Sequence, residues 1–287
     1  MGTTFWLVDA FTDRAFSGNP AGVFVVDSFP DASFMQAIAA ELNWSQTAFV
    51  KRLPSSTTEF DHFHIRWFSP RDETPICGHA TLASAHILWE KNFTHKNKIV
   101  FESLAGTLTV TKEQNNWITL DFPKKKLVSC ALPSELKQAL ITPDGEVNIT
   151  SVMRDELIYV VTLQNQSDLV ALTPNLTLIE SLDCRAVSVT TLGREDYDFE
   201  SRYFAPRVGI PEDPVCGSSH CRLGPLWAER LGKTSLMVYQ ASKRGGFMKI
   251  NMLDDRVLMS SKAITICEGN MALELLAKSE TKLKMVA

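Results

Sequence analysis

Two cysteines stand at matching positions of a duplicated segment. Glu73-Thr74-Pro75-Ile76-Cys77-Gly78 returns 139 residues later as Glu212-Asp213-Pro214-Val215-Cys216-Gly217. Each copy is typical of a turn that opens a helix, where glycine lets the backbone approach a ligand and the first-turn amides are unpaired donors. Two such helix N-termini facing one cleft would bind an anion, most simply a substrate carboxylate. A positive helix end also lowers the pKa of a nearby thiol. Cys77 and Cys216 therefore predict a two-base site that removes and returns a proton on a carbon beside that carboxylate.

The duplication extends beyond these turns. Arg66-Trp67-Phe68-Ser69-Pro70-Arg71 returns as Arg202-Tyr203-Phe204-Ala205-Pro206-Arg207, and residues 106–110 match 246–250. A long period with only two copies indicates two similar half-domains that face each other rather than a solenoid. Such a pseudo-twofold arrangement would bring one thiol from each half to a shared cleft.

Short β-branched and aromatic runs, which are typical of strands, dominate the chain. They cover residues 5–8, 23–26, 99–101, 108–110, 157–161 and 186–189. Helices are expected at 32–42, 79–90, 134–140 and 218–231, the second and fourth directly after the Cys-Gly steps. We therefore expect an α+β fold of two pseudo-symmetric halves, each a rolled mixed β-sheet around a central helix. No glycine-rich phosphate loop follows a strand, which disfavours a nucleotide-binding fold.

No linker rich in Pro, Gly or Ser separates the halves. The join is expected near Pro123-Lys124-Lys125-Lys126, whose charges are interpreted as solvated surface. The predicted N-terminal half is 1–124 and the C-terminal half 125–274, with the active-site cleft between them. A strand at about 275–287 is expected to pack back onto the first half.

Composition argues against several classes of protein. The 29 Lys and Arg against 33 Asp and Glu give a formal charge of −4 without an evident basic face, so nucleic acid is not an expected partner. No run approaches the roughly 18 apolar residues of a membrane span. No basic segment followed by an apolar stretch marks a secretory signal at the N-terminus. We therefore expect a cytoplasmic protein with no membrane partner.

The cysteines and histidines do not predict a metal site. Six cysteines in 287 residues are too sparse for a disulfide framework and lack the CxxC spacing of structural zinc sites. Reduced thiols are expected. His62 and His64 alternate on a strand, but no third ligand is apparent, so they are interpreted as an exposed strand face.

Several motifs resemble one family over nearly the whole chain. They are Asp9-Ala10-Phe11-Thr12, residues 16–23, Asn43-Trp44-Ser45-Gln46-Thr47-Ala48-Phe49, Cys77-Gly78-His79-Ala80-Thr81, residues 202–206 and residues 212–218. In this order they resemble the phenazine-biosynthesis (PhzF-like) isomerases. The resemblance implies a diaminopimelate-epimerase-like fold and isomerisation of a small carboxylate substrate without a cofactor. It also implies a homodimer.

The resemblance assigns roles to four positions. It implies an acid/base carboxylate at position 46, with His79, Asp213 and Ser218 as further catalytic residues. The family motif has Glu between Ser and Thr, whereas this chain has Gln46. An amide cannot carry a proton near neutral pH, and such a group contributes ~10²- to 10⁴-fold. The residues expected to bind substrate are Asn19, Gly78, Gly217 and Ser219.

A second departure from the family pattern favours another mechanism. The isomerases usually have Thr where this chain has Cys216, so the pair of Cys77 and Cys216 resembles the two-thiol epimerases and racemases of the same superfold. Two hypotheses of function follow. One is an isomerase or epimerase, working through thiols or through His79 and Asp213. The other is a binding protein that keeps the pocket without turnover because of Gln46.

Overall fold

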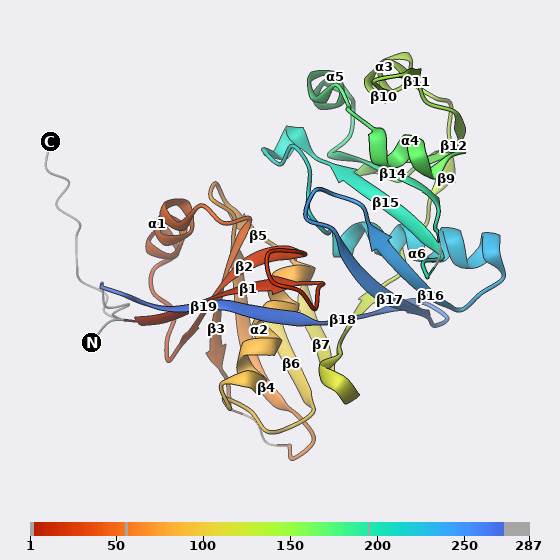
Figure 1. Cartoon of the computed structure of the whole chain (residues 1–287). Coiled ribbons are helices and arrows are strands. Elements are labelled where there is room, and N and C mark those ends of the chain that lie inside the picture. Colours follow the sequence, from red (N-terminus) through yellow and green to blue (C-terminus); the bar gives the residue numbers. More distant parts are fainter. Residues whose placement is uncertain (1–2, 55–56, 195, 273–287) are drawn as a thin grey trace, which may run out of the picture.

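A helix runs through the middle of each half of the molecule (Figure 1). These helices are α2 (Gly78–Glu90) and α6 (Gly217–Leu231), and both begin at the glycine of a Cys-Gly step. The computed structural model describes residues 3–54, 57–194 and 196–272. In each half the helix connects two parallel strands, because a parallel pair needs a long crossover. The predicted α+β fold, with a central helix in each sheet, is confirmed.

The strands of the two halves pair in the same pattern. The first half, in spatial order, contains β19 (Ala263–Met271), β1 (Thr3–Ala10), β2 (Asn19–Val26), β3 (Gln46–Arg52), β4 (Asp61–Phe68), β6 (Lys98–Ser103), β7 (Gly106–Lys112) and β8 (Ile118–Pro123). The second contains β9 (Val128–Ser129), β12 (Ile149–Arg154), β13 (Ile158–Leu163), β14 (Ala186–Leu192), β15 (Phe199–Phe204), β16 (Ser235–Gln240), β17 (Gly246–Met252) and β18 (Arg256–Ser261). In both rows the successive pairings are antiparallel, antiparallel, parallel, antiparallel, parallel, antiparallel and antiparallel. The sequence repeat is therefore a repeat of topology.

The halves exchange strands across a shared pair. β8 and β18 pair antiparallel, from Ile118 opposite Ser261 to Pro123 opposite Arg256. The chain leaves β8 to form β9 in the second half, and it leaves β18 to form β19 beside β1 in the first. The strand expected at about 275–287 lies outside the described residues. The chain instead returns to the first half in β19, which pairs with β1. β19 lies before residue 274, where the sequence pattern predicts the end of the second half.

The remaining elements of the described residues are smaller. They are α1 (Ala32–Leu42), β5 (Glu73–Thr74), a 3-10 turn at Gln114–Asn116, α3 (Ser134–Ala139), β10 (Ile141–Thr142), β11 (Gly145–Glu146), α4 (Gln166–Ala171), α5 (Leu176–Ser181) and a second 3-10 turn at Pro206–Val208. All four predicted helices are present within a residue of their expected ends. None of the helices in the described ranges is long and apolar enough to cross a membrane.

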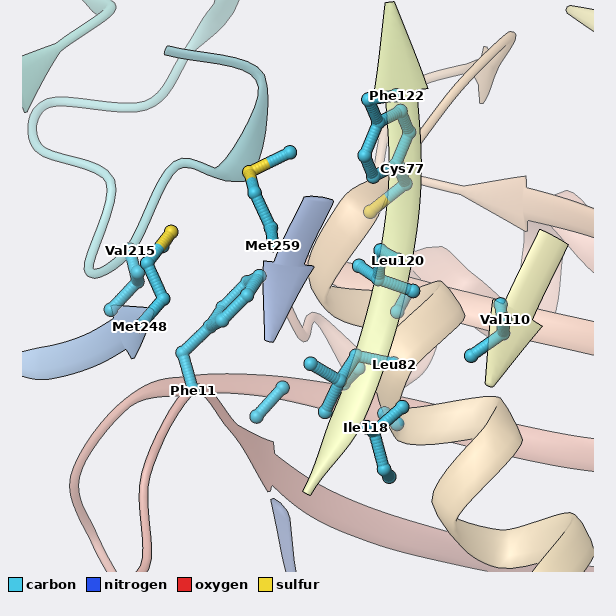
Figure 2. Packing of buried hydrophobic residues seen from close by; sticks show 14 of the residues in the cluster. Phe11, Cys77, Leu82, Val110, Ile118, Leu120, Phe122, Val215, Met248 and Met259 are labelled. Atoms are coloured by element: carbon cyan, nitrogen blue, oxygen red, sulfur yellow. The ribbon is translucent and has the colours of Figure 1, made fainter. Parts of the chain in front are cut away.

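One apolar cluster joins the halves. It contains residues of α2 and the first sheet together with Val215, Cys216 and strands of the second half. Figure 2 shows part of it, including Phe11, Cys77 and Met248. Phe11 is fully buried with φ of 64°, a conformation that costs a non-glycine residue about 1–3 kcal/mol. Its carbonyl accepts from the Phe247 amide in the second half, so the strained residue ties the halves together.

Candidate active site

The first residues of α2 and α6 touch at the junction of the halves. A methyl group on Gly78 would lie 3.8 Å from Gly217 Cα, and one on Gly217 would lie 3.9 Å from Gly78 Cα. No side chain caps either helix. The positive ends of two helix dipoles therefore converge, an arrangement that favours a bound anion. The two predicted turns therefore lie together at the junction of the halves, and the ligand-binding cleft expected between them stays a prediction.

On the first-half side, Cys77 and His79 form a pair. Cys77 Sγ lies 3.5 Å from His79 Nδ1, and His79 Nε2 lies 3.2 Å from Ser45 Oγ. Ser45 has one proton, which it directs to the Pro20 carbonyl or to Asn19 Oδ1. Neutral His79 therefore donates from Nε2 to Ser45, which leaves the lone pair of Nδ1 for the Cys77 thiol. A thiol next to an oriented imidazole can exchange a proton with it.

On the second-half side, Asp213 and Cys216 form the corresponding pair. The Cys216 thiol stabilises the ionised form of the Asp213 carboxylate, and Cys216 Sγ lies 3.3 Å from Ser218 Oγ. The Gln240 side chain shapes this loop, because it accepts from the Cys216 amide at 2.9 Å and donates to the Asp213 carbonyl at 2.6 Å. Ser218 is exposed at the start of α6, so a ligand can reach its hydroxyl.

Asn19 connects the two sides. Its Nδ2 donates to Asp213 Oδ1 at 2.6 Å and to the Val215 carbonyl at 3.0 Å, while its Oδ1 accepts from Ser45 at 3.1 Å. The side chain is fully buried. Asn19, expected to bind substrate, thus uses both ends of its amide within the protein and links Asp213 to His79 through Ser45.

The electrostatics of the site differ from the expectation for the thiols. Burial raises the pKa of Cys77 well above its usual range and raises the pKa of Cys216 to about 12. The nearby Asp213 carboxylate raises both pKa values further. The expectation that the helix ends lower these pKa values is wrong, because desolvation of a thiolate between two packed halves outweighs the helix ends. Both thiols are protonated at neutral pH.

The groups beside the thiols are both mainly in their basic forms at pH 7, although burial shifts their pKa values in opposite directions. Burial lowers the pKa of His79 to about 3, so its imidazole is neutral. Burial also raises the pKa of Asp213 to about 6, against hydrogen bonds from the Cys216 thiol, the Val215 amide and Asn19. Asp213 is therefore mostly ionised at pH 7 but close enough to neutrality to exchange a proton. The site thus contains two protonated thiols, each beside a base.

Two other predicted residues make different contacts. Gln46 begins β3 and is buried, and its Oε1 accepts from Thr74 Oγ1 at 3.2 Å. Its neighbour Ser45, rather than Gln46, contacts His79. The Ser219 hydroxyl lies 2.9 Å from Ser188 Oγ, and both are buried inside the second half. The structure therefore does not bring Ser219 to the substrate side of the turn.

Ser45 and Gln240 are parts of the site that sequence reasoning missed. Ser45 directly precedes Gln46 in the motif of residues 43–49. Its place beside a predicted site residue was the signal that could have indicated a role in the site. Gln240 ends β16, and nothing in its neighbourhood indicated a contact with residues 213–216. Within residues 3–54, 57–194 and 196–272, no three His, Cys, Asp or Glu side chains gather as metal ligands. His62 instead pairs with Glu102 at 2.9 Å.

This fold also occurs in a solved structure with little sequence identity to this chain. A hydroxyproline epimerase from Agrobacterium vitis has the same overall fold, with a TM-score of 0.61 at 11% identity, over 94% of this chain and 92% of that one. The family model for phenazine biosynthesis-like proteins matches residues 8–269. The chain therefore belongs to the phenazine biosynthesis-like protein family, which confirms the resemblance found in its motifs.

Two relatives cover almost the whole chain. An uncharacterized isomerase of Halalkalibacterium halodurans is 41% identical over 276 residues, with 95% of this chain and 100% of that protein aligned. The crystal structure of a PhzF-family phenazine biosynthesis protein from Enterococcus faecalis has a TM-score of 0.87 at 35% identity, over 95% of this chain and 100% of that one.

Proposed function

We propose that this protein is a cofactor-independent isomerase or epimerase that moves a proton on a carbon beside the carboxylate of a small acid. The observation that carries the proposal is the contact between Gly78 and Gly217, which places two uncapped helix N-termini together. The 41% identical relative named as an isomerase supports the reaction class.

The substrate carboxylate is the anion that the two helix ends would hold. Amides from both first turns can donate to its oxygens, and both helix dipoles favour its charge. Neither glycine carries a side chain that would cover these amides. A carboxylate bound there would have its adjacent carbon within the zone shared by Cys77 and Cys216, the residues that precede the glycines.

Proton transfer uses one thiol from each half. Cys216 passes its proton to the Asp213 carboxylate, and the resulting thiolate takes the proton from the substrate carbon. The electron pair of the broken C–H bond is delocalised into the bound carboxylate as an enolate, which the helix ends stabilise. Cys77 then donates its proton to the carbon. Solvent reprotonates Cys77 and takes the proton from Asp213, which restores the starting state.

The test is exchange of substrate hydrogen with solvent deuterium. Wild-type protein is incubated in D₂O with a panel of amino acids, hydroxy acids and a dihydroanthranilate-type acid, and exchange beside the carboxylate is followed by NMR. At least one acid should exchange, and Cys77→Ala or Cys216→Ala should slow its exchange about 10²-fold or more. Cys130→Ala, outside the site, is the matched control. Absence of exchange in every acid would contradict the proposal.

A second candidate function is ligand binding without turnover. Gln46 favours it, because an amide held by Thr74 stands where the family motif has a carboxylate. The raised thiol pKa values also favour it, because no thiolate is present at rest. Under this candidate, Gln46→Glu alone gains exchange activity, while the wild type is only stabilised by the acid. Exchange by the wild type at a rate equal to that of Gln46→Glu would exclude this candidate.

A further inference from the structure

A groove of about 550 Å³ lies where the chain passes from the first half to the second. It combines the end of the lysine run with the turn between β12 and β13 and one residue of α6. The lining residues are Lys125, Lys126, Val128, Arg154, Asp155, Glu156, Leu157 and Arg222. Four of these are cationic and two are acidic, although the whole chain has a formal charge of −4.

One of the acidic residues is already neutralised. Asp155 Oδ1 accepts from the Leu157 and Ile158 amides at 2.9 Å each. Its Oδ2 accepts from Arg222 Nε at 2.6 Å, and Arg222 is only 5% exposed. Both carboxylate oxygens are thus occupied by this turn and by the Arg222 guanidinium. Asp155 and Arg222 form the floor of the groove and leave its remaining charges uncompensated.

The remaining cations lack acidic partners. Among the described residues, neither the Lys125 nor the Lys126 ammonium makes a hydrogen bond or ion pair. Arg154 donates to the Asp155 carbonyl and to Tyr159 Oη, which are both uncharged. Glu156 is exposed on the rim. Three cations therefore face one carboxylate, a local excess of positive charge.

The backbone of the lysine segment is fixed in place by a proline in α6. Pro225 lies inside the helix and has no amide to donate to the Cys221 carbonyl four residues earlier. The Lys125 amide donates to that carbonyl instead, at 3.0 Å. The lysines therefore start from a defined position over the groove, unlike a freely solvated surface run.

We propose that this groove binds a small organic dianion. Its charged end would pair with Lys125, Lys126 and Arg154. Their three positive charges, less the negative charge of Glu156, leave a net charge of +2, which matches a dianion. Its apolar body would cover Val128 and Leu157, which are 63% and 51% exposed beside these cations. A phosphate monoester and a dicarboxylate share this chemistry. The groove is distinct from the Gly78–Gly217 contact. The two are linked only through α6, where Arg222 Nη1 donates at 3.0 Å to the carbonyl of Ser218, one helical turn earlier.

Calorimetric titration with two probes tests the proposal. Phenyl phosphate represents a phosphate monoester, phthalate represents a dicarboxylate, and benzyl alcohol is the uncharged control. Wild-type protein should bind at least one of the two anions with a Kd of about 1 mM or tighter. The double variant Lys125→Gln/Lys126→Gln should weaken binding about tenfold or more, the loss of one charge-assisted hydrogen bond. The headgroup that binds identifies which source of the dianion the groove prefers.

A matched variant distinguishes the groove from general electrostatic attraction. Lys243→Gln/Lys249→Gln removes the same charge from exposed positions in the second half and should leave binding unchanged. Binding at the candidate active site would also be equal in both double variants, so only their difference reports on the groove. Absence of binding to the wild type, or an equal loss in the two double variants, would overturn the proposal. Turnover is not measured, so the result is independent of the proposed isomerase activity.

Discussion

Asn19 Nδ2 and Asp213 Oδ1 lie 2.6 Å apart, so the two halves of the molecule share a hydrogen bond at the candidate site. Asn19 begins β2 in the first half, and Asp213 lies in the loop before α6 in the second. The bond stabilises the ionised form of a carboxylate whose burial favours the neutral form. The packing of the halves therefore helps set the protonation of the site.

Asp213 should make the protein less stable as pH rises. Because its folded pKa is raised from 3.8 to about 6, the native state binds more protons than the unfolded state between these values. The unfolding free energy should fall through this range by on the order of 2–3 kcal/mol because of this group. Asp213→Asn keeps an oxygen for Asn19 and removes the titration. In urea unfolding at pH 4, 5.5 and 7, the unfolding free energy of the variant should increase relative to that of the wild type as pH rises.

The exposed Asp144→Asn variant is the control for this measurement. It removes one carboxylate without touching the site, so its difference from wild type should stay small across the same pH range. If Asp213→Asn and wild type instead give parallel stability curves, the raised pKa of Asp213 is wrong.

Cys77 and Cys216 should react with iodoacetamide more slowly than Cys267 near pH 7.5. Their raised pKa values leave little thiolate, and both side chains are buried, whereas Cys267 is exposed. Peptide mass spectrometry over time should find Cys267 modified first. In urea, where the chain is unfolded, the labelling rates of these cysteines should become similar. If either Cys77 or Cys216 were labelled faster than Cys267 in the native protein, the helix N-termini would lower the thiol pKa after all, as the sequence pattern predicts.

Arg244 should be a large contributor to stability. It donates to Asp9 Oδ1 at 2.7 Å, to the Ser17 carbonyl at 3.0 Å and to the Gly18 carbonyl at 2.8 Å, so it holds the loop that leads into Asn19. Asp9 is only 2% exposed. Arg244→Ala leaves that buried carboxylate unpaired and should cost about 3–5 kcal/mol in urea unfolding.

Two comparisons isolate the ion pair in this experiment. Lys243→Ala, at the neighbouring exposed position, should cost less than about 1 kcal/mol. The double variant Asp9→Asn/Arg244→Ala should recover part of the loss, because no charge is then buried without a partner. A cost of Arg244→Ala equal to that of Lys243→Ala would show that the inter-half pair contributes nothing.

The duplication in the sequence predicted the fold well. Both Cys-Gly steps open central helices, and the matched turns meet, because equivalent positions of two halves approach each other near a pseudo-twofold axis. The repeated Arg and Glu residues also pair alike, Arg66 with Glu73 and Arg202 with Glu212. The strand exchange was less visible, because the return of β19 to β1 is a long-range pairing without a local signal.

The chemistry of the site was harder to predict than its location. A thiol pKa depends on desolvation by distant segments, which no spacing of residues reveals, so the lowered values expected for Cys77 and Cys216 were wrong. The direction of a helix residue was also hidden, since the Ser219 hydroxyl turns to Ser188. The lysine run received its fixed position from Pro225, a hundred residues away in the chain, where a missing amide freed an acceptor.

A crystal structure grown with a small planar carboxylate such as benzoate would show whether the two helix ends bind an anion together. We expect a carboxylate at the Gly78–Gly217 contact, with its oxygens about 2.7–3.2 Å from amides in the first turns of both α2 and α6. Cys77 and Cys216 should lie beside the carbon attached to it. A carboxylate bound by only one helix, or one bound elsewhere while Gly78 and Gly217 stay in contact, would show that the two helix ends do not form the substrate site.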